Sequence, residues 1–368
     1  MDGPIRVLHV VVNMNRGGAE TLIMNLYRNI DRSKIQFDFL TCKEGVFDQE
    51  ILDLGGKIHK IPYITDRGHF HYIKNLNQFF KVNKHYKIVH SHMDKMSGFV
   101  LEAAKKAGIQ VRIAHSHNTQ SEGGFAAKLY KEYAGINIGK SATHYLACSN
   151  SAAKWLFKSK ANSSKLLKNG IDTEKFTFSK KIRDKIRNEL GVEERLVLGN
   201  VGRFNHQKNH SFLIDIFSEL NMVEPKAYLV LVGDGALRPD IEEKVKRLGL
   251  EDKVKFLGVR SDINSLLQAF DFFVFPSFHE GLPVTLIEAQ GAGLPCLISE
   301  NITKEVDMGI NLVKFLPINK KNIWVEEIVG VLNKKVSRNI PHEALSQKGY
   351  DIKNTANFIH DFYMENAR

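Results

Sequence analysis

Cysteine is scarce in this chain, and its three cysteines, Cys42, Cys148 and Cys296, lie far apart in the sequence. An odd number of widely spaced cysteines supplies neither a disulfide framework nor a four-cysteine metal site. We therefore interpret the three as small buried apolar residues.

Long apolar runs are also lacking. Runs such as 7–12 and 270–276 fall well short of the roughly 18 to 20 uninterrupted apolar residues that a membrane-spanning helix needs, so we interpret them as buried strands. The chain enters the first of these runs without a basic leader or a small-residue cleavage site. We therefore expect no secretion signal and a cytoplasmic location.

Composition is otherwise ordinary for a globular protein, with 43% hydrophobic and 25% charged residues in a chain of 368, which is long enough for two domains. The net charge of +11 is unevenly spread. Residues 1–170 hold 25 Lys and Arg against 13 Asp and Glu, whereas residues 171–368 hold 27 against 28. A basic first half indicates an anionic partner, such as nucleic acid, an acidic membrane or a phosphorylated lipid, or else a surface charged only for solubility.

Strand-like segments alternate with helical ones and predict two doubly wound parallel sheets, an α/β fold. The strand-like segments are 5–12, 37–42, 57–62, 87–92, 110–117 and 143–149, then 195–202, 227–233, 254–259, 270–277 and 295–299. We place the domains at 1–172 and 173–348. Residues 349–368 form a terminal helix, because Ile352, Ala356, Ile359 and Tyr363 recur at helical spacing; which domain it packs on stays open.

The segment FPSFHEGLPVTLIEAQGAGLP, residues 275–295, carries the clearest chemical signal. It leaves a strand, turns through Glu280 and Gly281, and starts a helix near Pro283, which suits a first helical turn. Ligands of parallel sheets bind at such strand ends, where backbone N–H groups near Leu282 and Val284 would face a pyrophosphate; Pro283 itself has no N–H. Glu280 can then reach a sugar and Glu288, two turns into the helix, a ribose diol. Two solvated glutamates at this spacing are the alternative.

This segment resembles the donor site of retaining glycosyltransferases of family 4, which have the GT-B fold of two Rossmann-like domains facing each other across a cleft. The segment NVGRFNHQKNH, residues 200–210, resembles that family's G-R-x(4)-K motif. The resemblance assigns Arg203 and Lys208, after Gly202, to the donor diphosphate, and an Arg fork with a Lys charge suits a departing diphosphate.

Other segments extend the resemblance through both halves of the chain. It places Gly233 near the nucleotide and Val259 and Arg260 near the base. In the first half, Gly17 and Gly18 resemble the glycine loop after the first strand, with a plain strand-to-helix turn as the alternative. His117 occupies the position that contacts the donor sugar in the family, with His115 as the alternative. We thus expect Arg203, Lys208, Glu280 and His117 to be catalytic, and the glycines, Leu282, Pro283, Val284 and Glu288 to bind the donor.

The resemblance implies retention at the anomeric carbon and transfer from a nucleotide sugar, with UDP as the default base. No Asp-x-Asp sequence occurs, and the His-x-His segments 90–92 and 115–117 lack cysteine or acidic ligands at recognisable spacing, so we expect no metal and no other cofactor. Segment 298–307 lacks the glycine pair that many members of the family carry after this strand. In this respect the chain resembles the branch of the family that assembles polysaccharides. The acceptor is then an oligosaccharide or a lipid-linked saccharide. Segments 72–87 and 152–168, which mix Lys with Phe, Trp and Leu, suit a peripheral contact with an anionic membrane, or are ordinary amphipathic helices packed on the sheet.

Three other functions compete with this one. A sugar-nucleotide epimerase shares the fold and needs no acceptor. A nucleic-acid-binding protein fits the basic first half, but the chain has no aromatic RNA-binding signature or recognition-helix motif, so we expect no nucleic-acid partner. A dinucleotide-dependent oxidoreductase is disfavoured because the first turn is NRGGAE and not G-x-G-x-x-G.

Overall fold

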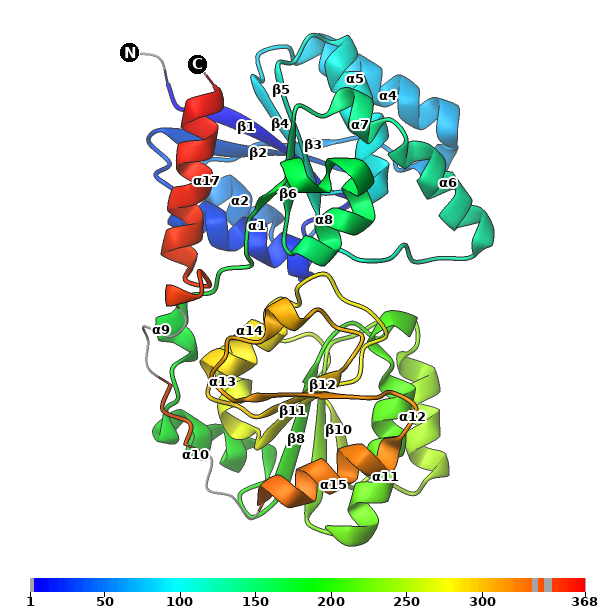
Figure 1. Cartoon of the computed structure of the whole chain (residues 1–368), viewed down its shortest axis with the longest axis vertical. Helices are drawn as coiled ribbons and strands as arrows, with labels where there is room; N and C mark the ends of the chain where they lie inside the picture. The colour runs from blue at the N-terminus through cyan, green and yellow to red at the C-terminus, as the bar shows by residue number, and fades with distance from the viewer. Residues whose placement is uncertain (1–2, 333–336, 341–345, 368) are drawn as a thin grey trace. The chain divides into compact units, whose positions relative to one another are not determined.

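The computed structural model describes residues 3–332, 337–340 and 346–367. It divides the chain into two compact units (Figure 1). Unit 1 comprises Met1–Gly170 together with Gly349–Arg368, and unit 2 comprises Ile171–Lys348. In the part of the chain that the structure describes, no helix combines the length and the apolar character that crossing a bilayer requires.

Unit 1 is built on a parallel sheet with the strand order β3-β2-β1-β4-β5-β6-β7. Its apolar runs form strands buried on both faces, as expected when helices cover both sides of a parallel sheet. The strands are β1 (Ile5–Val10), β2 (Ile35–Thr41), β3 (Ile58–Lys60), β4 (Ile88–Ser91), β5 (Val111–Ser116), β6 (His144–Ala147) and β7 (Lys165–Leu166).

The helices of unit 1 connect these strands, and one comes from the far end of the chain. They are α1 (Gly18–Asn29), α2 (Asp48–Asp53), α3 (Ile64–Arg67), α4 (His69–Val82), α5 (Ser97–Lys106), α6 (Phe125–Gly135), α7 (Ile138–Ser141), α8 (Asn150–Phe157) and α17 (Ile352–Asn366), with 3-10 turns η1 (Asp94–Met96) and η2 (Lys158–Ser163). Figure 1 shows α17, in red, beside α1 and the first strands. Ile352, Ala356, Ile359 and Tyr363 of α17 share one core with Val7 of β1, so the terminal helix belongs to unit 1.

Unit 2 repeats the architecture with the strand order β10-β9-β8-β11-β12-β13, all pairs again parallel. The strands are β8 (Leu196–Val201), β9 (Ala227–Val232), β10 (Val254–Phe256), β11 (Phe272–Phe275), β12 (Cys296–Ser299) and β13 (Val313–Leu316). The helices are α9 (Thr173–Phe176), α10 (Lys180–Leu190), α11 (His210–Val223), α12 (Arg238–Arg247), α13 (Ile263–Ala269), α14 (Val284–Gly291) and α15 (Lys321–Leu332), with 3-10 turns η3 (His206–Lys208) and η4 (Lys304–Val306).

The predicted α/β class with two doubly wound parallel sheets is confirmed. Each predicted strand segment overlaps a strand of the structure, and β7 and β13 are additional edge strands. Both are short and half-exposed, which is why their sequences lack the continuous apolar signal of a central strand.

Candidate functional site

The predicted site residues of unit 2 lie in the loops and helix starts that follow the carboxyl ends of four strands. Gly202, Arg203 and Lys208 follow β8, and Gly233 follows β9. Val259 and Arg260 follow β10, and the residues from Glu280 to Glu288 follow β11. Because β10, β9, β8 and β11 are consecutive in the sheet, their carboxyl ends form one continuous edge.

Two of these loops are bound together at Lys208 and Glu280. The Lys208 Nζ atom donates to Glu280 Oε1 over 2.7 Å, and 15% of the lysine and 8% of the glutamate side chain are exposed. The same Nζ lies 4.4 Å from the centre of the Phe275 ring. Next to this pair, Gln207 Nε2 donates to the His279 carbonyl over 2.9 Å and the Phe278 amide donates to Gln207 over 2.8 Å. The structure therefore brings together two residues that are 72 positions apart in the sequence.

The backbone beside this pair leaves no room for a side chain at Gly233. Its φ is +134°, and a Cβ atom there would lie 2.1 Å from the Gly202 carbonyl oxygen. The loops after β8 and β9 therefore approach as closely as glycine permits. Arg203, the next residue after Gly202, is exposed to solvent at this edge.

Helix α14 begins next to Glu280. Pro283 is its N-cap residue, with φ −69°, and Val284 is the first helical residue. Gly281, Leu282 and Pro283 are buried, as is Glu288 in the second turn of the helix. Burial raises the pKa of Glu288 to about 7, so this carboxyl group changes its charge near neutral pH.

Val259 and Arg260 lie one strand further along. The Gly233 amide donates to the Gly258 carbonyl over 2.8 Å, which holds the two loops together. Val259 is 58% exposed. Arg260 donates to both carboxylate oxygens of Asp262, over 2.8 and 2.7 Å, an ion pair that the sequence reasoning missed although the two residues are only two positions apart.

A cavity of about 740 Å³ in unit 2 lies elsewhere, at the amino ends of strands such as β8 and β11. None of the predicted site residues is among its described lining. Three of its cations are bound within the fold: Arg183 and Arg187 pair with Asp271, and Arg338 donates to backbone carbonyls such as that of Phe270. We therefore do not assign this cavity a place in the candidate site.

In unit 1, Gly17 and Gly18 lie where α1 begins. Gly17 is the N-cap residue with extended backbone, φ −116° and ψ 173°, and Gly18 is the first helical residue. The carboxylate of Glu20 folds back over this turn, because a Cβ atom on Gly17 would lie 2.3 Å from Glu20 Oε2. In this structure the glutamate thus covers the backbone that the sequence predicts to approach a ligand.

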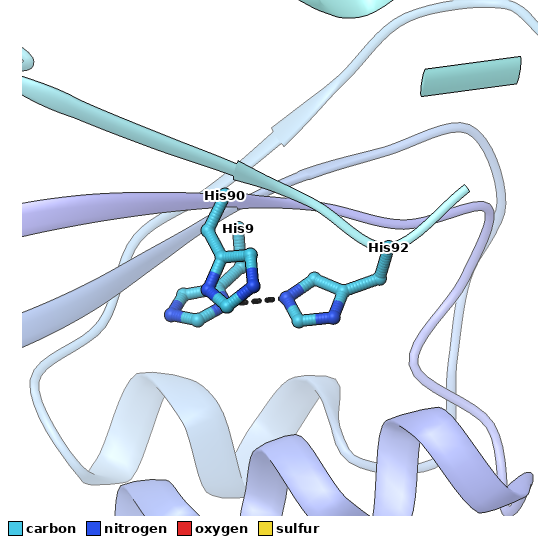
Figure 2. A group of neighbouring side chains, drawn as sticks. All are labelled: His9, His90 and His92. Carbon is cyan, nitrogen blue, oxygen red and sulfur yellow. Dashed lines mark hydrogen bonds between the residues drawn. The ribbon is translucent and has the colours of Figure 1, made fainter. Parts of the chain in front are cut away.

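Histidines gather at the ends of β1, β4 and β5. His9 Nδ1 and His92 Nε2 lie 2.9 Å apart and share a hydrogen bond, and His92 Nδ1 lies 2.9 Å from His117 Nε2. Figure 2 shows His9, His90 and His92 converging from neighbouring strands. His90 contacts His115 over 3.1 Å and the Tyr363 hydroxyl over 2.6 Å. We call these five histidines the histidine ladder.

Burial keeps the ladder uncharged. It lowers the pKa of His9 and of His117 to about 3, and it lowers the pKa of His90, His92 and His115 in the same direction. Neutral imidazoles also bind metals, and ring nitrogens within two triplets, His9–His90–His92 and His92–His115–His117, lie within 4.8 Å of one another. Among the described residues neither triplet includes a cysteine or a carboxylate, and both nitrogens of His92 already bond to histidines. Hydrogen bonds join His9, His92 and His117 in one group and His90 with His115 in another, and ring contacts of about 4 Å between His90 and His92 and between His115 and His117 connect the two groups.

His117 is the ladder member nearest solvent, since His115 is fully buried and His117 is half-buried. Its backbone amide donates to Asp94 over 3.0 Å, and Asn118 Nδ2 donates to the same carboxylate over 2.8 Å. Asp94 has a left-handed backbone, φ +45°, and burial raises its pKa. Sequence reasoning did not predict this supporting role; the only signal was the position of Asp94 just after a strand.

Two parallel doubly wound units, with charged side chains gathered in strand-end loops, are typical of nucleotide-dependent α/β enzymes. Residues 16–175 match the family model described as "Glycosyltransferase Family 4", and residues 182–340 match that of "Glycosyl transferases group 1". The chain is 40% identical, over 97% of its length and 96% of the relative, to "Putative glycosyltransferase EpsF" of Bacillus subtilis (strain 168). It belongs to this glycosyltransferase family, as its motifs predicted.

Two further similarities cover nearly the whole chain. The Escherichia coli "UDP-Gal:alpha-D-GlcNAc-diphosphoundecaprenol alpha-1,3-galactosyltransferase" is 28% identical, over 98% of this chain and 97% of the relative. The crystal structure of Anabaena HepE in complex with UDP-glucose matches with a TM-score of 0.81 at 20% identity, covering 98% of this chain and 99% of that one. The latter similarity shows that the two proteins share a fold.

Proposed function

We propose that this glycosyltransferase moves a sugar, with retention of the anomeric configuration, from a UDP-sugar to a lipid-linked saccharide in the assembly of a bacterial surface polysaccharide. The observation that carries the proposal is the Lys208–Glu280 pair beside the start of α14, with Glu288 buried in the same helix. It provides a cation, helix N–H groups and two carboxyl groups along one sheet edge.

In this proposal the donor diphosphate binds between Lys208, Arg203 and the first amides of α14. A cation and N–H groups at a helix start stabilise the negative charge that develops as the diphosphate departs, and no metal is needed for that. Glu280 holds the sugar, and Glu288 in its ionised form accepts hydrogen bonds from the ribose hydroxyls. The departing phosphate assists removal of the acceptor proton. Gly202, Gly233, Val259 and Arg260 contact the nucleotide.

In unit 1 we propose that His117 contacts the donor sugar through its neutral imidazole and that Gly17 and Gly18 contact the donor once Glu20 moves aside. The names of two similar proteins support the choice of ligands. One is a UDP-Gal-dependent transferase acting on a diphosphoundecaprenol-linked sugar, and the other was crystallised with UDP-glucose. A lipid-linked acceptor also gives the basic first half an anionic membrane as partner.

The test measures release of nucleoside diphosphate from UDP-, GDP- and ADP-sugars, with a saccharide on a diphosphoprenol carrier as acceptor. NMR of the product then determines the anomeric configuration of the new linkage. Lys208→Ala should lower kcat/KM on the order of 10²-fold to 10³-fold. Lys244→Ala is the matched control, because Lys244 pairs with Asp215 over 2.6 Å and is 18% exposed, yet lies on α12. Equal activity of the two variants would refute the assignment of the site. A changed sugar formed without acceptor would reveal an epimerase instead.

A further inference from the structure

Helix α6 exposes an apolar face that has no place in the core of unit 1. Of its residues only Ala134 is buried, whereas α1, which is similar in length, buries five. Phe125, Leu129, Tyr133 and the C-cap residue Ile136 are 80%, 54%, 55% and 61% exposed. Their spacing of four, four and three positions places them on one side of a helix.

The opposite side of α6 is firmly packed. Tyr130 Oη lies 2.6 Å from His69 Nδ1, and a Cβ atom on Gly98 of α5 would lie 1.9 Å from the Ala134 carbonyl oxygen. Phe70, next to His69, is 88% exposed. We call Phe125, Leu129, Tyr133 and Ile136 the α6 face. It is presented by a helix held against its neighbour and not by a loose loop.

Lysines are frequent in α6 and in the segment that follows it. Residues 121–160 contain six lysines, two glutamates and no arginine or aspartate. One of the glutamates, Glu132, pairs with Lys95 and Lys158. Ile136 also lines a cavity of about 420 Å³ with further apolar walls, including Leu156 and Phe157, and with Lys158 and Lys160 among its lining residues. The surface thus combines exposed aromatic and aliphatic side chains, an apolar hollow and positive charge.

The segments that sequence reasoning selected for membrane contact, 72–87 and 152–168, bury most of their large apolar side chains. Tyr72, Phe79 and Phe80 of α4 are buried, as are Leu156 and Phe157 of α8. Their apolar side chains pack in unit 1, as the alternative interpretation of ordinary amphipathic helices expected. A row of exposed apolar side chains lies on α6, which the sequence analysis had not singled out; segment 72–87 exposes Val82, and segment 152–168 contributes Leu156 and Phe157 to the adjoining cavity.

We propose that the α6 face docks on a bilayer surface that contains acidic phospholipid. Exposed aromatic and aliphatic side chains insert at the boundary between headgroups and acyl chains, and nearby lysines attract anionic headgroups. A second copy of the chain fits less well, because it would bring the same lysines together. The proposal deepens the proposed function, on which it rests, since an acceptor on a lipid carrier is presented at a membrane.

Vesicle flotation tests the docking without any donor or acceptor. The full chain should float with vesicles of phosphatidylcholine and phosphatidylglycerol, and much less with phosphatidylcholine alone. Phe125→Ser with Leu129→Ser should reduce the bound fraction at least about tenfold, because both side chains leave the apolar contact. Lys128→Glu with Lys160→Glu should reduce it as well, and added salt should weaken binding of the unmodified chain.

Met222→Ser with Val223→Ser is the matched control, because these residues are 74% and 61% exposed but lie on α11 in unit 2. This control should float like the unmodified chain, and unchanged melting temperatures will show that each variant folds. Absence of flotation, or equal flotation of the α6 variant and the control, overturns the proposal. So does a dimer in light scattering that the α6 variant abolishes. If the unmodified chain floats with the acidic vesicles but transfers no sugar, the proposed function fails and the docking result stands.

Discussion

Lowering the pH from about 7.5 to about 5 should destabilise unit 1 more than unit 2, because the histidine ladder must stay neutral to remain folded. Burial lowers the pKa of His9 and His117 from 6.5 to about 3. Between those values the unfolded chain binds protons that the folded chain excludes. The stability that the neutral His9 and His117 contribute is therefore fully present above pH 6.5 and is lost as the pH falls toward 3.

The size of the effect follows from linkage. At pH 5, a histidine with a pKa of 6.5 unfolded and about 3 folded favours unfolding by about 2 kcal/mol, so His9 and His117 together contribute about 4 kcal/mol. A whole domain is typically stable by only about 5 to 15 kcal/mol. His90, His92 and His115 act in the same direction.

Unit 2 should respond less because two of its groups oppose each other. Burial lowers the pKa of His210 to about 3, which costs stability in acid. It raises the pKa of Glu288 from 4.5 to about 7, so the folded unit 2 binds a proton more readily than its unfolded form as the pH falls through that range. Glu288 therefore adds stability on acidification and offsets part of the His210 loss.

The chain allows each unit to be followed separately, since it has two tryptophans, Trp155 in unit 1 and Trp324 in unit 2. Urea unfolding of Trp324→Phe reports unit 1 by fluorescence, and Trp155→Phe reports unit 2. In the Trp324→Phe background, His9→Gln should flatten the pH dependence of the unfolding free energy by about 1.4 kcal/mol per pH unit below pH 6.5. His85→Gln, at an exposed position, is the control. If His9→Gln and His85→Gln gave the same slope, the neutral-ladder argument would fail.

Two further predictions concern donor binding and the support of α6. In the proposed function the ionised Glu288 carboxylate accepts hydrogen bonds from both ribose hydroxyls, and protonation at a pKa of about 7 takes away part of that acceptor capacity. UDP-sugar affinity should therefore weaken as the pH falls below 7, by up to about tenfold per pH unit, and Glu288→Gln should bind weakly without this pH dependence; calorimetric titration at several pH values checks both. Gly98→Ala should cost unit 1 about 1 to 3 kcal/mol, because its Cβ would meet the Ala134 carbonyl at 1.9 Å, whereas Gly139→Ala, which meets nothing within 4 Å, should cost less in the same urea assay.

The central strands could be predicted because their chemistry is local. Segments such as 5–12 and 270–277 are continuous apolar runs, and burial on both faces of a parallel sheet requires that pattern. The edge strands β7 and β13 could not be predicted in this way. Each has a neighbour on only one side and is partly exposed, so its sequence need not be a continuous apolar run. Similarly, the periodicity of α17 predicted a helix, whereas its position in unit 1 depends on a core that it shares with β1 and α1.

The candidate site was predictable to the level of the sheet edge but not of the individual contact. Strand ends placed Lys208 and Glu280 in the same region, and the structure adds that they bond to each other. Any diphosphate at Lys208 must therefore compete with, or share, a cation that Glu280 already neutralises. Lys208 consequently does not act as an isolated charge, and removing it also leaves a nearly buried carboxylate without this partner, a cost that adds to the lost contact with the donor.

The histidine ladder shows that the hydrogen bonding of one residue can depend on residues far away in the sequence. His9, His92 and His117 come from three strands that are neighbours in the order β1-β4-β5, so one histidine near the end of each strand is enough to build a hydrogen-bonded row. The sequence drew attention to His117 and to the His-x-His segments but not to His9 or to the bonds between these rings, and Tyr363, which contacts His90, lies 273 positions away. A neutral imidazole has one donor nitrogen and one acceptor nitrogen, so the choice at His9 sets the choice at His92 and then at His117. The hydrogen-bonding character of the half-buried His117 is therefore determined by residues that no ligand needs to touch.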